Sequence, residues 1–151
     1  MIHDQSPFTH LDERAKRVVE LARRKADGRH SEFIAPEHVL LALVEMRRGL
    51  AARAVANLSG SSARAEDAIA GALRSGRRSS PSHIPFASAT EEILVRAAQQ
   101  ARLLGDEHIG TEHLLLGLLC AADNTAVRGL RELGVTYDTA RAEVGRLRAG
   151  S

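Results

Sequence analysis

The chain has 151 residues, of which 44% are hydrophobic and 26% are charged. This size suits one compact domain or two very small ones and excludes a large multidomain machine. Aromatic residues make up only 3%, while Ala, Leu and Arg dominate, so the composition favours helices and argues against an all-β fold. The formal net charge of +2 is too small to indicate a nucleic-acid partner by itself.

Cysteine usage and hydropathy predict the compartment. Cys120 is the single cysteine and lies in an apolar run, so we expect a small buried side chain in a reducing environment. The longest apolar stretch, 114–122, is far shorter than the roughly 20 residues that a membrane span needs. The first residues also lack the apolar segment of a signal peptide. We therefore expect a cytoplasmic protein with no membrane contact.

The sequence repeats itself at an offset of 75 residues. The segment IAPEHVLLAL at 34–43 is echoed by IGTEHLLLGL at 109–118, and the flanking residues align at the same offset. Between the copies, 75–85 is rich in Ser, Gly and Pro, which predicts a linker. The units 8–74 and 86–149 are each small for independent stability. We expect them to pack around a pseudo-two-fold axis into one domain.

Each copy begins with an amphipathic helix followed by a buried one. Apolar residues recur at helical spacing in both first helices, namely Ala15, Val18, Val19, Ala22 and Ala26, and then Ile93, Leu94, Ala97, Ala101 and Leu104. The second helices, over 37–47 and 112–122, are apolar nearly all round, which predicts a buried centre. Pro36 suits a helix start, and Thr111 at the matching position is a good N-cap.

Two shorter helices complete each copy. The third helix is expected over 50–58 and again over 125–133, with Gly60 and Gly134 at the ends. The fourth helix is expected over 63–74 in the first copy and over 139–148 in the second. The sequence therefore predicts an all-α fold of eight helices, four in each copy.

No catalytic or metal-binding constellation is present in the sequence. The seven histidines include no pair at helical i, i+4 spacing with an acidic partner, and Cys120 has no adjacent base. Nucleophile-elbow, phosphate-loop and dinucleotide-binding motifs are also missing from the sequence. We expect no enzyme activity, no metal and no cofactor, and we expect His38 and His113 to hydrogen-bond backbone carbonyls.

The two glutamates at the starts of the buried helices, Glu37 and Glu112, have two interpretations. A carboxylate in the first turn is stabilised by the helix macrodipole, so each could serve as a cap. Alternatively, the free N–H groups of the helix start could bind an anion while the glutamate binds a cation beside it. A ligand that carries both charges would suit such a site.

The motif IGTEHLLLGLL at 109–119, preceded in each copy by an amphipathic helix, resembles the Clp N-terminal domain, or Clp repeat domain, of ClpA- and ClpC-type AAA+ unfoldases. The resemblance covers about residues 8 to 149, and HIPF at 83–86 also resembles the segment that joins the two ClpC-type repeats. It implies two four-helix repeats in one domain that binds proteins and performs no catalysis.

The resemblance also implies a ligand. ClpC-type domains dock adaptor proteins and capture substrates marked by arginine phosphorylation. The glutamate of each G-T-E-H motif holds the guanidinium, and the helix start holds the phosphate. Carried over to this sequence, the site residues are Glu112 with Thr111 and Gly110 in the second copy, and Glu37 in the first.

A second implied surface is an apolar groove that binds cyclic-peptide antibiotics in this family. Here the resemblance points to Phe8 and Phe86, with Val19 and Leu94 on the adjacent first helices. The implied partners are therefore adaptor or substrate proteins and cyclic-peptide natural products.

This sequence departs from the family pattern in two places. Ala35-Pro36 replaces Gly-Thr in the first copy, which removes one N–H donor and one hydroxyl, so we expect unequal sites. ATPase modules do not follow the second copy, so we expect a stand-alone monomer that acts as a decoy or regulator of a full-length Clp unfoldase, or else an excised domain.

Two other functions stay open. The fold could recruit a partner without any affinity for phosphoarginine. Alternatively, the basic residues that crowd the first helix could bind nucleic acid, although we interpret that face as solvated and expect no nucleic-acid partner. These residues are Arg14, Lys16, Arg17, Arg23, Arg24 and Lys25.

Overall fold

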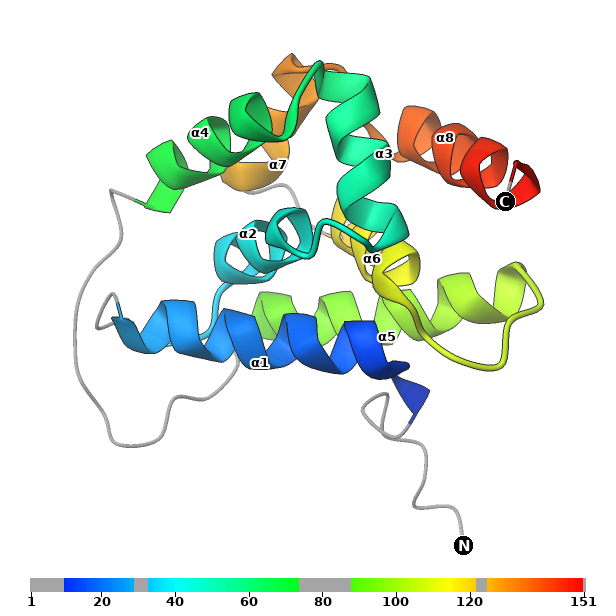
Figure 1. Ribbon diagram of the computed structural model, residues 1–151. Helices are drawn as coiled ribbons and strands as arrows, with labels where there is room; N and C mark the ends of the chain where they lie inside the picture. Colours follow the sequence, from blue (N-terminus) through cyan, green and yellow to red (C-terminus); the bar gives the residue numbers. More distant parts are fainter. Residues whose placement is uncertain (1–9, 29–32, 74–87, 122–124, 151) are drawn as a thin grey trace, which may run out of the picture.

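The computed structural model describes residues 10–28, 33–73, 88–121 and 125–150, and these residues form eight helices and no strand (Figure 1). The helices are α1 (Glu13–Gly28), α2 (Pro36–Glu45), α3 (Leu50–Ser59), α4 (Ser62–Leu73), α5 (Ser88–Leu103), α6 (Thr111–Ala121), α7 (Thr125–Glu132) and α8 (Tyr137–Ala149). The predicted all-α class and the four helices per repeat are confirmed. The expected linker at 75–85 lies outside the described residues.

The helix α1 is amphipathic, as its spacing predicts. Its buried residues are Ala15, Val18, Ala22 and Ala26, which share one face. Three of these four are alanines, so the helix can approach its neighbours closely. The opposite face carries charged side chains joined by ion pairs within the helix, such as Arg23 with Glu20 at 3.1 Å.

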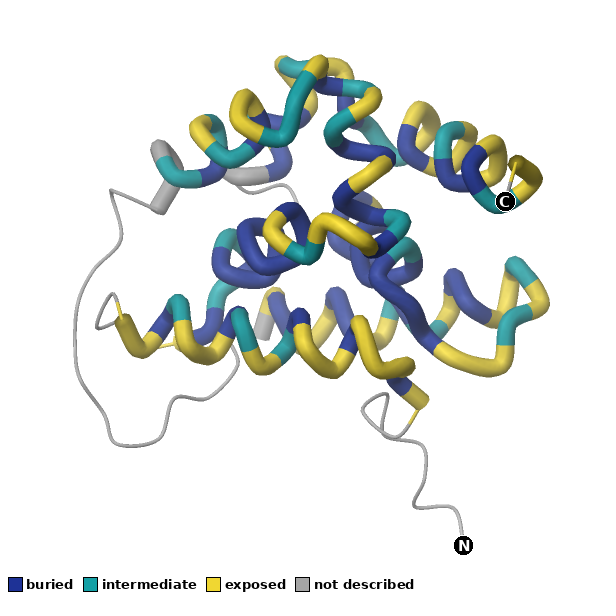
Figure 2. The backbone as a smooth tube through the Cα atoms, in the orientation of Figure 1, coloured by how far each residue is buried: buried dark blue, intermediate teal, exposed yellow. Residues whose placement is uncertain are grey.

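The helices α2 and α6 form the centre of the molecule (Figure 2). Nearly every residue of α2 is buried, and 114–119 of α6 is buried without interruption. Helices that are apolar on all sides require neighbours on all sides, and the remaining helices supply them. The prediction of a buried second helix in each repeat is confirmed.

The two repeats share one core because their helices pair across the boundary. The third helix of each repeat packs on the fourth helix of the other, α3 on α8 and α4 on α7. The helix α1 also touches α6, and α2 touches α5. These contacts occur in matched pairs, as a pseudo-two-fold arrangement requires, and they join the buried residues of both repeats into one cluster.

The most extensive helix packing lies between α5 and α6, and it depends on Gly117. A Cβ atom at Gly117 would lie 2.7 Å from the backbone nitrogen of Ala97 and 2.8 Å from the carbonyl oxygen of Ile93. Both obstacles are backbone atoms of α5, so neither can rotate away. The repeat offset places Ala42, which carries a Cβ atom, at the equivalent position of α2.

Replacing Gly117 with alanine is therefore expected to destabilise the fold by about 1–3 kcal/mol, because the added methyl forces α5 and α6 apart. Urea unfolding followed by circular dichroism measures the change. The matched control is Gly145→Ala in α8, where a Cβ meets nothing within 4 Å, and where alanine should stabilise by about 0.5–1 kcal/mol. Equal effects of the two substitutions would contradict the close packing.

Candidate functional site at the start of helix α6

The start of α6 lies beside the start of α1. The Ile109 N–H donates to the carbonyl of His10 at 2.7 Å, and the Asp12 N–H donates to the carbonyl of Ile109 at 2.9 Å. These bonds form a parallel bridge between Leu11 and Ile109. The Oδ1 atom of Asp12 then accepts from the Ala15 N–H at 2.8 Å and caps α1. The two helix starts are thus held together by backbone bonds.

Both buried helices carry, in their first turn, a histidine ring that accepts a hydrogen bond from a backbone N–H. The Nδ1 atom of His38 accepts from the Ala35 N–H at 2.9 Å, and Nδ1 of His113 accepts from the Gly110 N–H at 2.8 Å. The expectation that these rings bond backbone carbonyls was wrong for Nδ1. An unpaired N–H at a buried helix start needs an acceptor, and the ring three residues later is placed to provide one.

The other ring nitrogen of His113 belongs to a polar network with Asp106. Because Nδ1 accepts, Nε2 carries the ring proton and donates to Oδ2 of Asp106 at 2.8 Å. Arg148 of α8 donates to both oxygens of the same carboxylate, at 2.8 and 2.9 Å. The hydrogen bonds from Arg148 are the main reason that the pKa of Asp106 lies below its ordinary value, and the bond from His113 lowers it further.

The same arginine reaches Glu112. The Nη1 atom of Arg148 lies 3.7 Å from Oε2 of Glu112, whose side chain is only 14% exposed. The other oxygen of Glu112 turns back over Gly110, where a Cβ would lie 2.6 Å from Oε1 and 3.0 Å from Oδ2 of Asp12. Glycine at position 110 therefore makes room for two carboxylates at the helix start.

Thr111 has a role that the sequence did not indicate. It is the first residue of α6 rather than its N-cap, and its hydroxyl accepts from the Ala51 N–H of α3 at 3.3 Å. A Cβ on Gly49 would lie 2.7 Å from that hydroxyl, so glycine is needed there as well. The buried Thr111 side chain thus caps a helix of the other repeat, and the prediction that it caps α6 was wrong.

The backbone at the start of α6 still offers donors. The N–H groups of Thr111 and Glu112 have no acceptor among the described residues. Around them lie the carboxylates of Asp12, Asp106 and Glu112 and the guanidinium of Arg148. The excess of carboxylates favours binding of a cationic group. The guanidinium and the two N–H groups can donate hydrogen bonds to an anionic group.

The first repeat keeps the glutamate without its surroundings. Glu37 is half-buried, and it has no ion pair or hydrogen bond within the described part of the chain. Pro36 supplies no N–H there. The repeat offset places Ser31 and Leu73 at the positions of Asp106 and Arg148, so the first repeat lacks the residue types that build the second site.

The predicted apolar groove is only partly described. Phe8 and Phe86 lie outside the described residues. Val19 is partly buried against the core, and Leu94 is a core residue at 5% exposure. The groove stays a prediction. Leu94 has little exposed surface that could line it.

Cys120 is exposed, which corrects the prediction of a buried side chain. It lies near the C-terminal end of α6, where the helix emerges from the core after Leu119. The apolar run in the sequence indicated burial, but the buried part of α6 ends at Leu119, one residue before Cys120.

The chain is similar in sequence to one known domain family. The model of the Clp repeat (R) N-terminal domain family matches residues 10–133. The chain belongs to this family. The relatives include the Bacillus subtilis protein named negative regulator of genetic competence ClpC/MecB, which is 33% identical over 137 residues. That alignment covers 91% of this chain but only 17% of the Bacillus protein.

Solved structures of the N-terminal domains of Hsp104 and ClpV share the fold. The Hsp104 N-terminal domain from Candida albicans has a TM-score of 0.78 at 18% identity, with 94% of this chain and 93% of that chain covered. The ClpV N-domain in complex with a VipB peptide has a TM-score of 0.68 at 16% identity, with 91% and 90% covered. Within the described part of this Clp repeat domain, no helix is long and apolar enough to cross a membrane.

The polar network of the second repeat could not be predicted from the sequence. Asp106 and Arg148 are 42 residues apart, and nothing in their local sequence pairs them. The repeated His38 and His113 were visible, but the tautomer that each adopts follows from the backbone N–H that it meets. The only available signal was the position of histidine one residue after the glutamate in both copies.

Replacing Asp106 with asparagine tests the network through acid stability. A carboxylate with a lowered pKa in the folded state adds stability above its unfolded pKa of about 3.9, and this stability is lost as the pH falls through the folded value. Asp106→Asn should therefore cost about 1–3 kcal/mol at pH 7 and should make the loss of stability below pH 4 shallower.

Urea unfolding at stepped pH measures both effects. The control is Asp67→Asn, which removes an exposed carboxylate of α4 that has no ion-pair partner among the described residues. An unchanged acid profile in Asp106→Asn would contradict the bonds from Arg148 and His113.

Proposed function

We propose that this Clp repeat domain is a non-catalytic, cytoplasmic protein-recognition module of the Clp system, which binds adaptor proteins and substrates that carry phosphorylated arginine. Family membership supports the Clp assignment. The absence of any nucleophile–base pair or metal-binding motif from the sequence supports the non-catalytic role.

The observation that carries the ligand proposal is the pair formed by Glu112 and Arg148. A carboxylate and a guanidinium lie 3.7 Å apart at a helix start. Phosphoarginine presents the complementary pair, a guanidinium carrying a phosphoryl group. Glu112 binds the ligand's guanidinium in place of its weak internal partner, and Arg148, held in position by Asp106, contacts the phosphate together with the N–H of Glu112.

The two repeats do not contribute equally to this function. Glu37 can bind a guanidinium, but Pro36 has no backbone N–H to offer at its helix start. The first repeat also has no aspartate at the position that matches Asp106 and no arginine at the position that matches Arg148. Phosphoarginine therefore binds Glu112 more tightly than Glu37.

The apolar groove around Phe8, Phe86, Val19 and Leu94 is the proposed site for cyclic peptides and for apolar segments of partners. A related fold, the ClpV N-domain, forms a complex with a peptide of VipB, which favours peptide binding as a general property of this architecture. A domain that recruits partners only through such a surface, without affinity for phosphoarginine, is the competing function.

Isothermal titration with free phosphoarginine tests the proposal, with arginine and phosphate as separate controls. Glu112→Ala should weaken binding about tenfold or more, because a charge-assisted bond to the guanidinium is lost. The matched variant Glu37→Ala should have a smaller effect. Circular dichroism establishes that both variants are folded.

Two results would contradict this assignment. Equal losses in the two variants would remove the inequality between the repeats. Absence of binding by the unmodified domain would exclude phosphoarginine and would favour the partner-recruiting function.

A further inference from the structure

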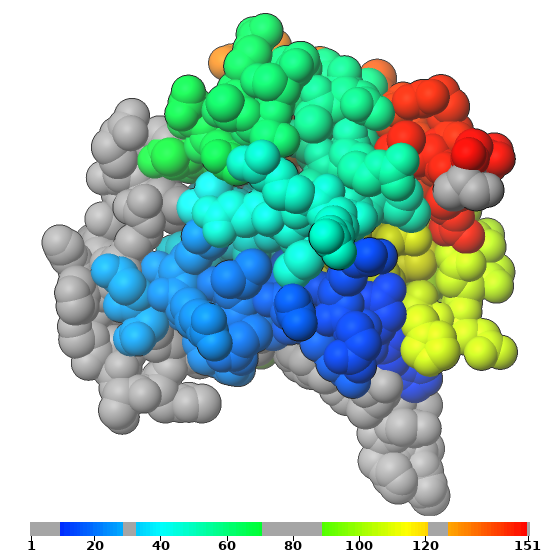
Figure 3. Space-filling model, viewed as in Figure 1, coloured from blue at the N-terminus to red at the C-terminus, as the bar shows by residue number. Residues whose placement is uncertain are grey.

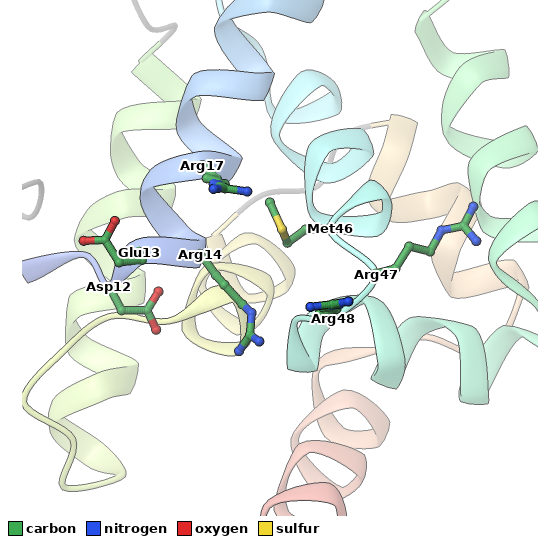
Figure 4. Close-up of a pocket in the computed structure, with 7 residues that line it drawn as sticks. All are labelled: Asp12, Glu13, Arg14, Arg17, Met46, Arg47 and Arg48. Atoms are coloured by element: carbon green, nitrogen blue, oxygen red, sulfur yellow. The ribbon is translucent and has the colours of Figure 1, made fainter.

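A groove rich in arginine runs between α1 and the turn that joins α2 to α3. It has a volume of about 700 Å³, and its walls carry Arg14, Arg17 and Arg48 around Met46 (Figure 4). A smaller hollow of about 360 Å³ shares Arg17 and Met46 and continues the groove along α1. In the space-filling view, the turn lies directly above α1 on one face of the molecule (Figure 3).

Three of the arginines in this groove have no counter-ion among the described residues. Arg14, Arg17 and Arg48 are exposed, and none of them forms an ion pair or hydrogen bond within the described part of the chain. Arg47 also lines the groove, but its guanidinium is turned toward α4, where it pairs with Glu66 at 3.1 Å (Figure 4). Like charges gathered around one hollow repel each other, and an anionic ligand would relieve that repulsion.

The second repeat has lost this basic character. At the repeat offset, Arg14 corresponds to Ala89, Arg17 to Glu92 and Arg48 to Asp123. Two of the three arginines are thus replaced by acidic residues in an otherwise related unit. The basic groove therefore belongs to one repeat, and it does not follow from the fold or from a general excess of arginine.

The lining also selects among anionic ligands. Met46 gives the groove an apolar component, and the carboxylates of Asp12 and Glu13 lie at one end. A nucleic-acid strand carries a charge on every phosphate and would meet those carboxylates. A peptide can match both features, with acidic side chains near the arginines and apolar ones near Met46.

We propose that this groove binds an acidic peptide segment of a partner protein. Glutamate or aspartate side chains of the segment pair with Arg14, Arg17 and Arg48, and its apolar side chains pack on Met46. This surface borders the phosphoarginine site at Asp12, which lines the groove and faces Gly110, but none of its arginines forms an ion pair with Glu112 in the described part of the chain.

Fluorescence anisotropy tests the groove with a short labelled peptide in which glutamate alternates with serine. The probe should bind at low salt and should weaken as salt rises. A peptide with glutamine in place of glutamate should not bind. The double variant Arg14→Gln/Arg48→Gln should weaken binding about tenfold or more.

The matched control is Arg102→Gln/Arg141→Gln, which removes the same charge from exposed positions of α5 and α8. It should bind the peptide as the unmodified domain does, and so should Glu112→Ala. Equal losses in both double variants would show that net charge alone attracts the peptide and would overturn the proposal.

Two further results would also overturn it. One is no binding of the glutamate peptide. The other is a labelled single-stranded oligonucleotide that binds more tightly than the peptide and loses affinity in the groove variant. The Glu112→Ala variant distinguishes the two proposals. If the groove does not bind the peptide, the phosphoarginine site at α6 is still tested separately.

Discussion

One hydrogen bond between the repeats, from the Ala51 N–H to the hydroxyl of Thr111, fixes how α3 begins relative to α6. The bond satisfies a backbone donor that α3 cannot satisfy itself, because its N-cap is Gly49. It also requires glycine at position 49, where any larger residue would displace the hydroxyl. The helix α3 also packs on α8, which carries Arg148 to the start of α6.

The proposed phosphoarginine site and the arginine groove meet at Asp12. Its Oδ1 caps α1, its Oδ2 faces Gly110, and the residue also lines the end of the groove. One side of this residue is rich in carboxylates and the other is rich in guanidinium groups. The first repeat thus supplies a basic surface and the second an acidic helix start, although both descend from one repeated unit.

The sequence was sufficient for the fold because helical spacing and duplication are local signals. Residues such as Val18 and Ala22 mark the buried face of α1, and Gly60 and Gly134 end α3 and α7 with φ angles of 102° and 91°. The motif around Glu112 also pointed to the candidate site. Its chemistry was harder to predict, because the partners of Asp106 and Thr111 come from distant segments.

The errors of sequence reasoning have a common origin. The expectations for His113, Thr111 and Cys120 were each drawn from their own helix, whereas each outcome depends on what packs against that helix. The ring of His113 accepts from a backbone N–H, and the hydroxyl of Thr111 accepts from an N–H at the start of α3. Cys120 is exposed, because no described helix covers it. Comparing the two repeats does not help at Thr111 and Cys120. The residues at the matching positions, Pro36 and Glu45, have different chemistry.

The most direct test of the account is a titration of the ¹⁵N-labelled domain with phosphoarginine, followed by NMR. The amide signals of Thr111 and Glu112 and the side-chain Nε–H signal of Arg148 are expected to shift together, with smaller changes around Glu37. Shifts confined to Glu37, or no shift at the start of α6 at saturating ligand, would contradict it.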